Sequence, residues 1–334
     1  QLVSRAKARG IAFTPRQVFD KRTVAGIASV AVEVDAGAAG ALAELPGGGI
    51  GELPLAPATR FMVERGGQFG RFNQTVTLEL PVGLDRDGLL AVLGAVVATH
   101  DMLRARLYFD DMAGQWREVV ETTSAVSVDR LVRHREFPAD LGADELRSLG
   151  ETELAAAVDL LDPAQGVVAQ FIWLEPQGST SRRGYLIAAI HHLAVDGVSW
   201  RILIEDLVTA WAQYANGQTP RLAPVGTSMR RWATALEAAA YERARIAEAG
   251  FWTSMLAQPD PLLADRPFDP ARDLAALVRS FSVEVPEAQT RALLTTVPGL
   301  FHGGVNDALV TALAIALVRW RARRGVDERS VLIR

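Results

Sequence analysis

Two adjacent histidines near the middle of the chain have the residue types and spacing for acid–base chemistry. His191 and His192 end an apolar run, Asp196 follows four residues after His192, and Gly197 comes next. A neutral imidazole is suited to proton transfer near pH 7. Because neighbouring residues of a strand point to opposite faces, one histidine should face the sheet packing and the other should face out at the strand end. In α/β folds ligands bind at such strand ends, so this stretch predicts an acid–base site.

The segment after the histidines is predicted to be a turn followed by a helix. Gly197 permits backbone angles that other residues resist, and Asp196 and Ser199 are candidate helix caps. Two other interpretations of the histidines stay open at this point. A buried histidine is more often a hydrogen-bonded core residue than a catalytic one. Metal binding is not favoured, because the other three histidines show no ligand spacing and the chain has no cysteine.

Composition narrows the class of protein. The chain has 334 residues, of which 49% are hydrophobic and 22% charged, with a net charge of −4. These values predict a globular protein and give no indication of nucleic-acid or anionic-membrane binding. The longest apolar run, Ala308–Val318, is too short to span a bilayer, and no signal peptide is recognised. We therefore expect a soluble, cytoplasmic protein without disulfides.

Strand and helix patterns alternate along the chain, which predicts an α/β fold with two lobes joined near residue 225. The two strands with near-continuous apolar runs should lie mid-sheet with both faces covered. The residues before 34 should form a compact helical unit. Strands are expected at 71–80, 102–109, 114–121, 166–175, 184–192, 279–285 and 329–334. Helices are expected at 85–100 with Asp85 as N-cap, 142–157, 199–216, 228–240, 242–257, 286–297 and, as a buried core helix, 304–322.

The histidine stretch resembles a known family. HHLAVDG, at 191–197, matches the HHxxxDG signature of the condensation-like domains of nonribosomal peptide synthetases, and VSWRIL after it resembles their epimerization branch. The opening QLVSRAKARGIAFTPRQVFDKRTVAGIA resembles the last part of a peptidyl carrier domain. Further stretches similar to the family lie at 53–67, 72–81, 100–107, 160–175 and 297–320, so the resemblance covers nearly the whole chain.

The resemblance implies a two-lobed chloramphenicol acetyltransferase-like fold. Residues 1–33 would be the end of a carrier domain, 34–50 a linker, 51–225 the first lobe and 226–334 an incomplete second lobe. It makes His192 the catalytic acid/base and His191 mainly structural. Asp196 would pair with Arg104 and brace the loop, and Gly197 would let the backbone pass close to the substrate tunnel.

Three more residues lie near that tunnel in the resemblance: Ser199, Trp200 and Asn306. Packing is the favoured role for Trp200. For Asn306, an N-terminal cap of the helix at 304–322 is an equally good interpretation.

The implied reaction is inversion at the α-carbon of an aminoacyl or peptidyl thioester carried on a 4′-phosphopantetheine arm. It needs no metal and no redox cofactor. The expected partners are the peptidyl carrier domain and the neighbouring synthetase domains, with adenylation upstream and condensation downstream. Neither nucleic acid nor a membrane is an expected partner.

The sequence departs from the family in one respect. The Glu-Gly-His-Gly-Arg-Glu segment that supplies a second acid/base is absent, as is the serine that bears the pantetheine. We therefore expect a fragment of a larger synthetase that is inactive by itself. Three rivals remain: a peptide-bond-forming condensation domain, a silent docking domain and a free acyltransferase. The VSWRIL continuation and the carrier-like opening argue against the first and third, and the intact His192, Asp196 and Arg104 argue against the second.

Overall fold

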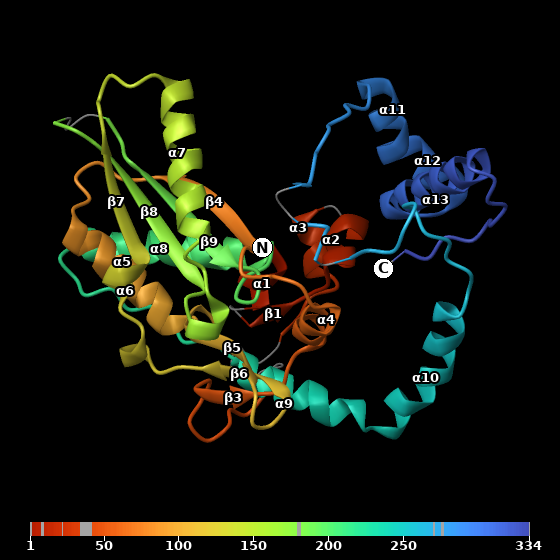
Figure 1. Ribbon diagram of the computed structural model, residues 1–334, viewed down its shortest axis with the longest axis horizontal. Coiled ribbons are helices and arrows are strands. Elements are labelled where there is room, and N and C mark those ends of the chain that lie inside the picture. The colour runs from red at the N-terminus through yellow and green to blue at the C-terminus, as the bar shows by residue number, and fades with distance from the viewer. Residues whose placement is uncertain are drawn as a thin grey trace. The chain divides into compact units, whose positions relative to one another are not determined.

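The computed structural model divides into two compact units, Gln1–Val63 with Phe69–Glu237, and Glu64–Gln68 with Ala238–Arg334 (Figure 1). The domain boundaries expected from the sequence stay predictions, and residues 34–41 of the expected linker lie outside the described residues. The structure describes residues 2–7, 10–21, 23–33, 42–178, 182–269, 271–274 and 277–333.

A four-stranded sheet is the centre of the first unit, in the order β4 (Asn73–Glu79), β9 (Tyr185–His191), β8 (Ala169–Pro176) and β7 (Val132–Phe137). The pairs are antiparallel except β7–β8, which is parallel. The two apolar strands lie mid-sheet, as predicted, because only an inner strand has both faces covered. The register places His191 opposite Asn73, so the histidine pair sits at the end of β9 beside the start of β4.

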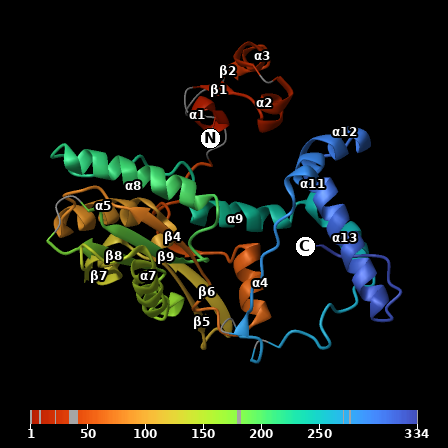
Figure 2. The same cartoon turned by 90° about the horizontal axis from the view of Figure 1, so that it is seen from above.

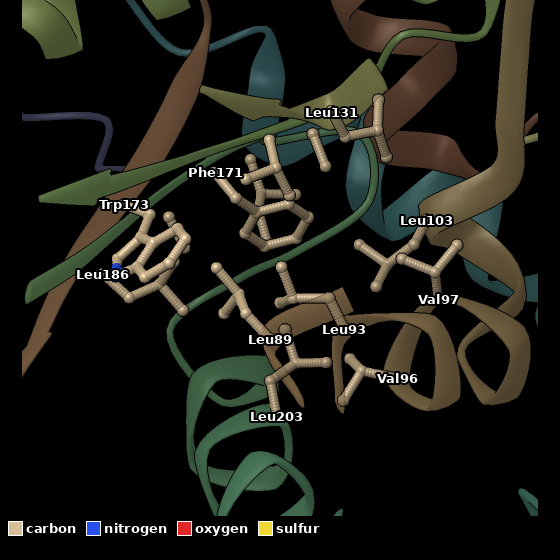
Figure 3. Close-up of a cluster of buried hydrophobic side chains, with 14 of the residues drawn as sticks. Leu89, Leu93, Val96, Val97, Leu103, Leu131, Phe171, Trp173, Leu186 and Leu203 are labelled. Atoms are coloured by element: carbon tan, nitrogen blue, oxygen red, sulfur yellow. The ribbon is translucent and has the colours of Figure 1, made fainter. Parts of the chain in front are cut away.

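Two helices cover one face of this sheet, and their positions follow from local sequence signals. Helix α5 (Arg86–Thr99) begins after Asp85, whose carboxylate accepts from the Gly88 amide at 2.8 Å. Helix α8 (Ser199–Ala215) packs beside it. Figure 2 shows both on one side of the sheet, with α7 on the other. Figure 3 shows how leucines of α5 and Leu203 of α8 meet Phe171 and Trp173 of β8 in the main core.

Helix α7 (Ala143–Val158) covers the opposite face of the sheet. Its leucines pack against Ile172 and Ile187, which are the residues of β8 and β9 that point away from the main core. Period-two alternation therefore divides each inner strand between two separate cores. The same alternation gives His191 and His192 different surroundings.

A second, three-stranded antiparallel sheet has the order β3 (Gly51–Leu53), β6 (Gln115–Val120) and β5 (Ala105–Asp110). Strand β5 of this sheet follows α5 through a short turn at Asp101–Arg104. Strand β6 buries an acidic residue: Glu118 is 1% exposed, and neither carboxylate oxygen has a hydrogen-bond partner among the described residues. Burial alone raises the pKa of Glu118 to about 7.

Replacing Glu118 by glutamine should stabilise the protein, and the gain should grow with pH. The folded state holds the Glu118 proton up to about pH 7, whereas the unfolded state loses it near 4.5. Wild-type stability is therefore lost as the pH rises between these two values. In urea unfolding, E118Q should gain roughly 2–3 kcal/mol more at pH 8 than at pH 5, at about 1.4 kcal/mol per pKa unit. A pH-independent difference between the two proteins would contradict this account.

The N-terminal residues form three short helices, α1 (Leu2–Lys7), α2 (Pro15–Lys21) and α3 (Val24–Ala28), and a two-stranded sheet of β1 (Ile11–Ala12) and β2 (Val32–Glu33). Gly10, between α1 and β1, adopts a positive φ of 76°, a backbone conformation that glycine tolerates. The helical character of this segment is confirmed. Its identity as a carrier-domain remnant stays a prediction.

The described part of the linker is attached to helix α9 (Met229–Ala240). The Glu44 carboxylate accepts from the amide and the hydroxyl of Ser228, at 3.1 and 2.9 Å. The Arg230 guanidinium donates to the carbonyls of Pro46, Gly48 and Glu52. This part of the expected linker is therefore held against α9 by hydrogen bonds.

Helices are the regular elements of the second unit in the part of the chain that the structure describes: α10 (Arg243–Leu256), α11 (Glu287–Arg291), a π-helical turn at Ala292–Thr296, α12 (Val297–Phe301) and α13 (Val305–Arg323). Long irregular stretches, such as 258–269 and 278–286, connect them. The predicted strands at 279–285 and 329–334 are wrong for the residues described, since neither segment has a partner strand to complete its hydrogen bonds. Arg334 lies outside the described residues. The helix predicted at 304–322 is present as α13, but it is not a buried core helix: Leu309 and Leu313 are half exposed, and Arg321 is its buried residue.

The elements of the first unit that were not predicted include strand β3, helix α4 (Pro57–Arg65), helix α6 (Val128–Leu131) and strand β7. Strand β7 lies at the sheet edge, and its middle residues are charged or polar and largely exposed. An edge strand of this kind lacks the apolar pattern by which strands are recognised in a sequence.

No single helix among the described residues is long and apolar enough to cross a membrane. One bent pair, Glu287–Phe301 with Val305–Arg323, passes the same test of length and composition, with an angle of 99° between its helices.

Candidate active site

His191 is fully buried and is fixed by two hydrogen bonds at the end of β9. Its Nε2 lies 2.8 Å from the Phe69 carbonyl oxygen, and its Nδ1 lies 3.0 Å from the Leu193 amide nitrogen. A carbonyl can only accept and an amide N–H can only donate, so the ring is neutral with its proton on Nε2. Burial lowers the pKa of His191, which agrees with this state. Both nitrogens are occupied, so His191 holds the chain rather than meeting a substrate.

His192 is partly buried and is held on two sides by the start of β4. Its backbone N–H donates to the Phe72 carbonyl oxygen at 2.7 Å. The Phe72 ring stacks on the imidazole, with centroids 4.7 Å apart and planes inclined by 21°. Its Nε2 lies 3.1 Å from the side-chain nitrogen of Gln74. The two histidines therefore have different surroundings: His191 is fully buried, and His192 is partly buried against Phe72 and Gln74. The outward orientation expected for His192 stays a prediction.

Gln74 connects His192 to helix α8. Its side-chain oxygen accepts from the indole nitrogen of Trp200 at 2.9 Å. Gln74 was not among the predicted site residues, although its position in the sequence gives an indication of its role. It is the polar member of an alternating series in which Val76 and Leu78 of β4 are apolar and partly buried. A partly buried polar side chain of a strand needs a partner, and here it has two.

The loop after the histidines is fixed by Asp196 and Ser199. One Asp196 carboxylate oxygen accepts from the Val198 amide at 2.9 Å, the Ser199 amide at 2.8 Å and the Ser199 hydroxyl at 2.7 Å. The Ser199 hydroxyl in turn accepts from the Asp196 amide at 3.0 Å. The two side chains therefore fix the turn that leads into α8, but the N-cap residue of that helix is Val198, so the prediction of Asp196 or Ser199 as the cap is not confirmed. Gly197 lies exposed between them.

Removing the Asp196 carboxylate should destabilise the protein by about 1 kcal/mol, because the amides of Val198 and Ser199 lose their acceptor in this turn. The hydrogen bonds from Ser199 and Val198 lower the pKa of Asp196 below its usual value of 3.8. The charged form is thus favoured in the folded state, and its contribution is present above pH 3.8 and lost as the pH falls through the lower folded value. Thermal unfolding of D196A at pH 7 and pH 3 measures this. D196N keeps an acceptor and should lose less at pH 7, and equal losses for the two variants would contradict this role of the carboxylate.

The predicted pairing of Asp196 with Arg104 is wrong. Arg104 is 2% exposed and pairs with Asp101, at 2.7 Å. Its other nitrogens donate to the carbonyls of Val97 and Ala98 at the end of α5 and of Glu121 after β6. The physical reason is local, because Asp101 is three residues away and the open carbonyls of a helix end attract a guanidinium. Arg104 therefore links the end of α5 to the second sheet by hydrogen bonds. The Asp196 carboxylate accepts hydrogen bonds from residues of its own loop.

A pocket of about 530 Å³ lies beside the loop and includes Ser199 in its wall. His100 also lines it and bonds through Nε2 to the Asp206 carboxylate of α8, at 2.7 Å. Residues of the histidine loop, the turn before β5, the start of α8 and the start of α9 line the rest: Asp101, Met102, Leu103, Ala194, Val195, Ile202, Leu203, Val225, Thr227, Ser228, Met229 and Trp232, with Leu42 of the linker. His192 is not among these lining residues.

Asn306 belongs to the second unit, whereas the other predicted site residues belong to the first. It is exposed in the first turn of α13, and the cap of that helix comes from Asp307, whose carboxylate accepts from the Gly304 amide at 2.7 Å. The interpretation of Asn306 as the cap is therefore wrong. Its proximity to a tunnel stays a prediction.

One group of potential metal ligands is brought together elsewhere in the first unit. His134 and Glu136 of β7 and Glu175 of β8 have ligand atoms within 4.8 Å of one another. His134 already bonds to Glu175 at 2.7 Å and stacks on Trp173. These contacts belong to the edge of the sheet.

Comparison with known proteins identifies the family. The family model described as the condensation domain matches residues 52–326. The chain belongs to the condensation-domain family. This condensation-family domain is 34% identical over 329 residues to a linear gramicidin synthase protein of Brevibacillus parabrevis, covering 98% of this chain and 4% of that protein. It is 32% identical over 328 residues to chondramide synthase of Chondromyces crocatus, covering 96% of this chain and 8% of that protein.

Solved structures agree with the fold of this condensation-family domain. The epimerization domain from the third module of tyrocidine synthetase B superposes with a TM-score of 0.65 and 25% identity, over 81% of this chain and 60% of that one. A condensation domain that mediates chain release from the enacyloxin polyketide synthase superposes with a TM-score of 0.59 and 19% identity, over 96% and 63% of the two chains. The α/β class and the family resemblance predicted from the sequence are confirmed.

Proposed function

We propose that this condensation-family domain inverts the α-carbon of an aminoacyl or peptidyl thioester carried on a 4′-phosphopantetheine arm. The observation that carries the proposal is the fixed imidazole of His192, held at a strand end by Phe72 and Gln74 with no charged partner in hydrogen-bonding contact among the described residues. The similarity to a solved epimerization domain and the VSWRIL continuation support inversion over peptide-bond formation.

The chemistry follows from the acidity of a proton next to a thioester. A base takes the α-proton, the electron pair of the broken C–H bond moves onto the carbonyl, and an enolate forms. A proton returned to the other face of the α-carbon completes the inversion, so atoms and electrons balance without a metal or redox group. His192 is the acid–base group on one face. The phosphopantetheine arm belongs to the carrier domain, which is the proposed partner along with the adjacent synthetase domains.

A second acid–base group must act on the opposite face of the substrate. The glutamate segment that the resemblance assigns to this role is not in these 334 residues. We therefore infer that inversion requires the synthetase module that contains this chain. The chain spans only 4–8% of the length of the two curated relatives described above.

The test follows the α-hydrogen directly. The carrier of the intact module is loaded with an L-aminoacyl group deuterated at the α-carbon, and deuterium loss and the D:L ratio are measured over time. Loss of label together with a D/L mixture is expected. Retained label with formation of a peptide bond to an offered amine would instead make this a condensation domain, the activity favoured by the family match alone. Retained label with neither product would leave a docking role.

A further inference from the structure

We propose that Gln74 and Trp200 are positioning residues that fix the proton of the neutral His192 imidazole on Nδ1 and leave the lone pair on Nε2. The inference rests on the proposed function for its consequence in catalysis. Its structural content, the tautomer of His192, stands on the contacts among these three side chains.

The direction of the hydrogen bonds follows from the one group that cannot be reversed. An indole N–H only donates, so the atom of Gln74 that lies 2.9 Å from Trp200 Nε1 must be the amide oxygen. The amide nitrogen of Gln74 then lies 3.1 Å from His192 Nε2 and carries only hydrogens. Nε2 must therefore accept, and in the neutral ring the proton is on Nδ1. Trp200 thus determines the tautomer of His192 through Gln74.

Backbone contacts hold in place the hydrogen-bonded series Trp200–Gln74–His192, called the relay below. Gln74 pairs with Ile190 in the β4–β9 ladder, two residues before His192. His192 is tied to Phe72 through its own N–H at 2.7 Å. Trp200 is in the first turn of α8, and the Asp196 carboxylate holds the start of that helix by accepting from the Ser199 amide. The backbone of each of the three residues is therefore held in place independently of the other two.

The relay also affects the two directions of proton transfer. The single lone pair of Nε2 accepts from the Gln74 amide, so Nε2 can take the α-proton of the substrate only after that hydrogen bond breaks. The new N–H of Nε2 and the amide N–H of Gln74 are then two donors that oppose each other. Gln74 cannot resolve this by rotating its amide, because the rotation would place its NH₂ group against the indole N–H. Release of the proton from Nε2 restores the hydrogen bond. The arrangement consequently favours an Nε2 that accepts a proton only transiently.

The nitrogen signals of histidine report the tautomer without any activity. The full chain is labelled with ¹⁵N-histidine, and the His192 signals are assigned by their loss in H192Q. The wild-type protein at neutral pH should show a protonated Nδ1 and an unprotonated Nε2. In W200F the amide of Gln74 is free to rotate, and the spectrum should change to a mixture of the two tautomers. In Q74E the carboxylate accepts from both neighbours, so Nε2 should become protonated.

The matched control is W211F, because Trp211 lies on the same helix and stacks on Tyr214 without a bond to Gln74. It should leave the His192 signals as in the wild type. An unprotonated Nε2 in Q74E, or identical spectra for W200F and wild type, would overturn the proposal. W200F could change the spectrum merely by folding poorly. Q74E keeps the size of the side chain, so its spectrum tests the proposal independently of that effect.

Failure of the proposed function is distinguishable from failure of the relay. In the loaded module, W200F should lower kcat for deuterium loss more than it raises KM, since the positioning of a base acts on the chemical step. If the wild-type module retains the label while the spectra behave as stated, the relay stands and epimerization fails. If the label is lost but Q74E and W200F leave the tautomer unchanged, epimerization stands and the relay fails.

Discussion

His192→Ala should lower the rate of α-deuteron loss in the loaded module by a factor of about 10² to 10⁴, the usual contribution of a positioned acid–base group. The Phe72 ring and Gln74 fix the imidazole of His192. Among the described residues, no other side chain that hydrogen-bonds to His192 Nε2 could act as the base in its place. The measurement is the initial rate of deuterium loss by mass spectrometry, with the D:L ratio as a second readout.

The control for this variant is His134→Ala. His134 is also a partly exposed, stacked histidine, but it lies at the sheet edge against Trp173. Its removal should leave the rate of deuterium loss within about twofold of wild type. A rate for H192A within a few-fold of wild type would show that another group removes the α-proton, and the assignment of His192 would then be wrong.

Arg104→Met should be the most destabilising of the substitutions considered, at about 3–5 kcal/mol, because it breaks a buried ion pair and leaves one partner behind. The carboxylate of Asp101 would lose its partner, and the carbonyls of Val97, Ala98 and Glu121 would lose their donor. Since these groups join α5 to the second sheet, the loss should appear as a lower urea midpoint for the first unit. Methionine has a similar length, which limits the cavity contribution.

Two further variants define this result. Arg104→Lys keeps the charge but cannot supply the branched set of donors, so it should fall between wild type and methionine. Arg147→Met removes an exposed arginine paired with Asp144 on α7 and should change stability by no more than about 0.5 kcal/mol. A loss below about 1 kcal/mol for R104M would mean that the carbonyls find water instead, and Arg104 would not be the fastening between α5 and β6.

The helices and inner strands of the first unit could be predicted because their signals are local. Asp85 caps α5 as expected, and β8 and β9 occupy the centre of the sheet. In the second unit the same reasoning was less successful. Residues 279–285 alternate as a strand would, yet Phe281 and Val283 are exposed and have no partner strand in the described chain. A strand depends on a neighbour for its hydrogen bonds, whereas a helix such as α13 completes its own.

The sequence by itself determined the family, the histidine pair and the different surroundings of its two rings, since alternation along a strand is a property of the backbone. Only the tertiary structure decided the partners. Arg104 bonds to Asp101 and to carbonyls rather than to Asp196, and Gln74 reaches both His192 and Trp200 across gaps of 118 and 126 residues. The choice among several polar partners depends on where strand register and helix docking bring each side chain. Such distances follow from packing of the whole unit, and no local pattern encodes them.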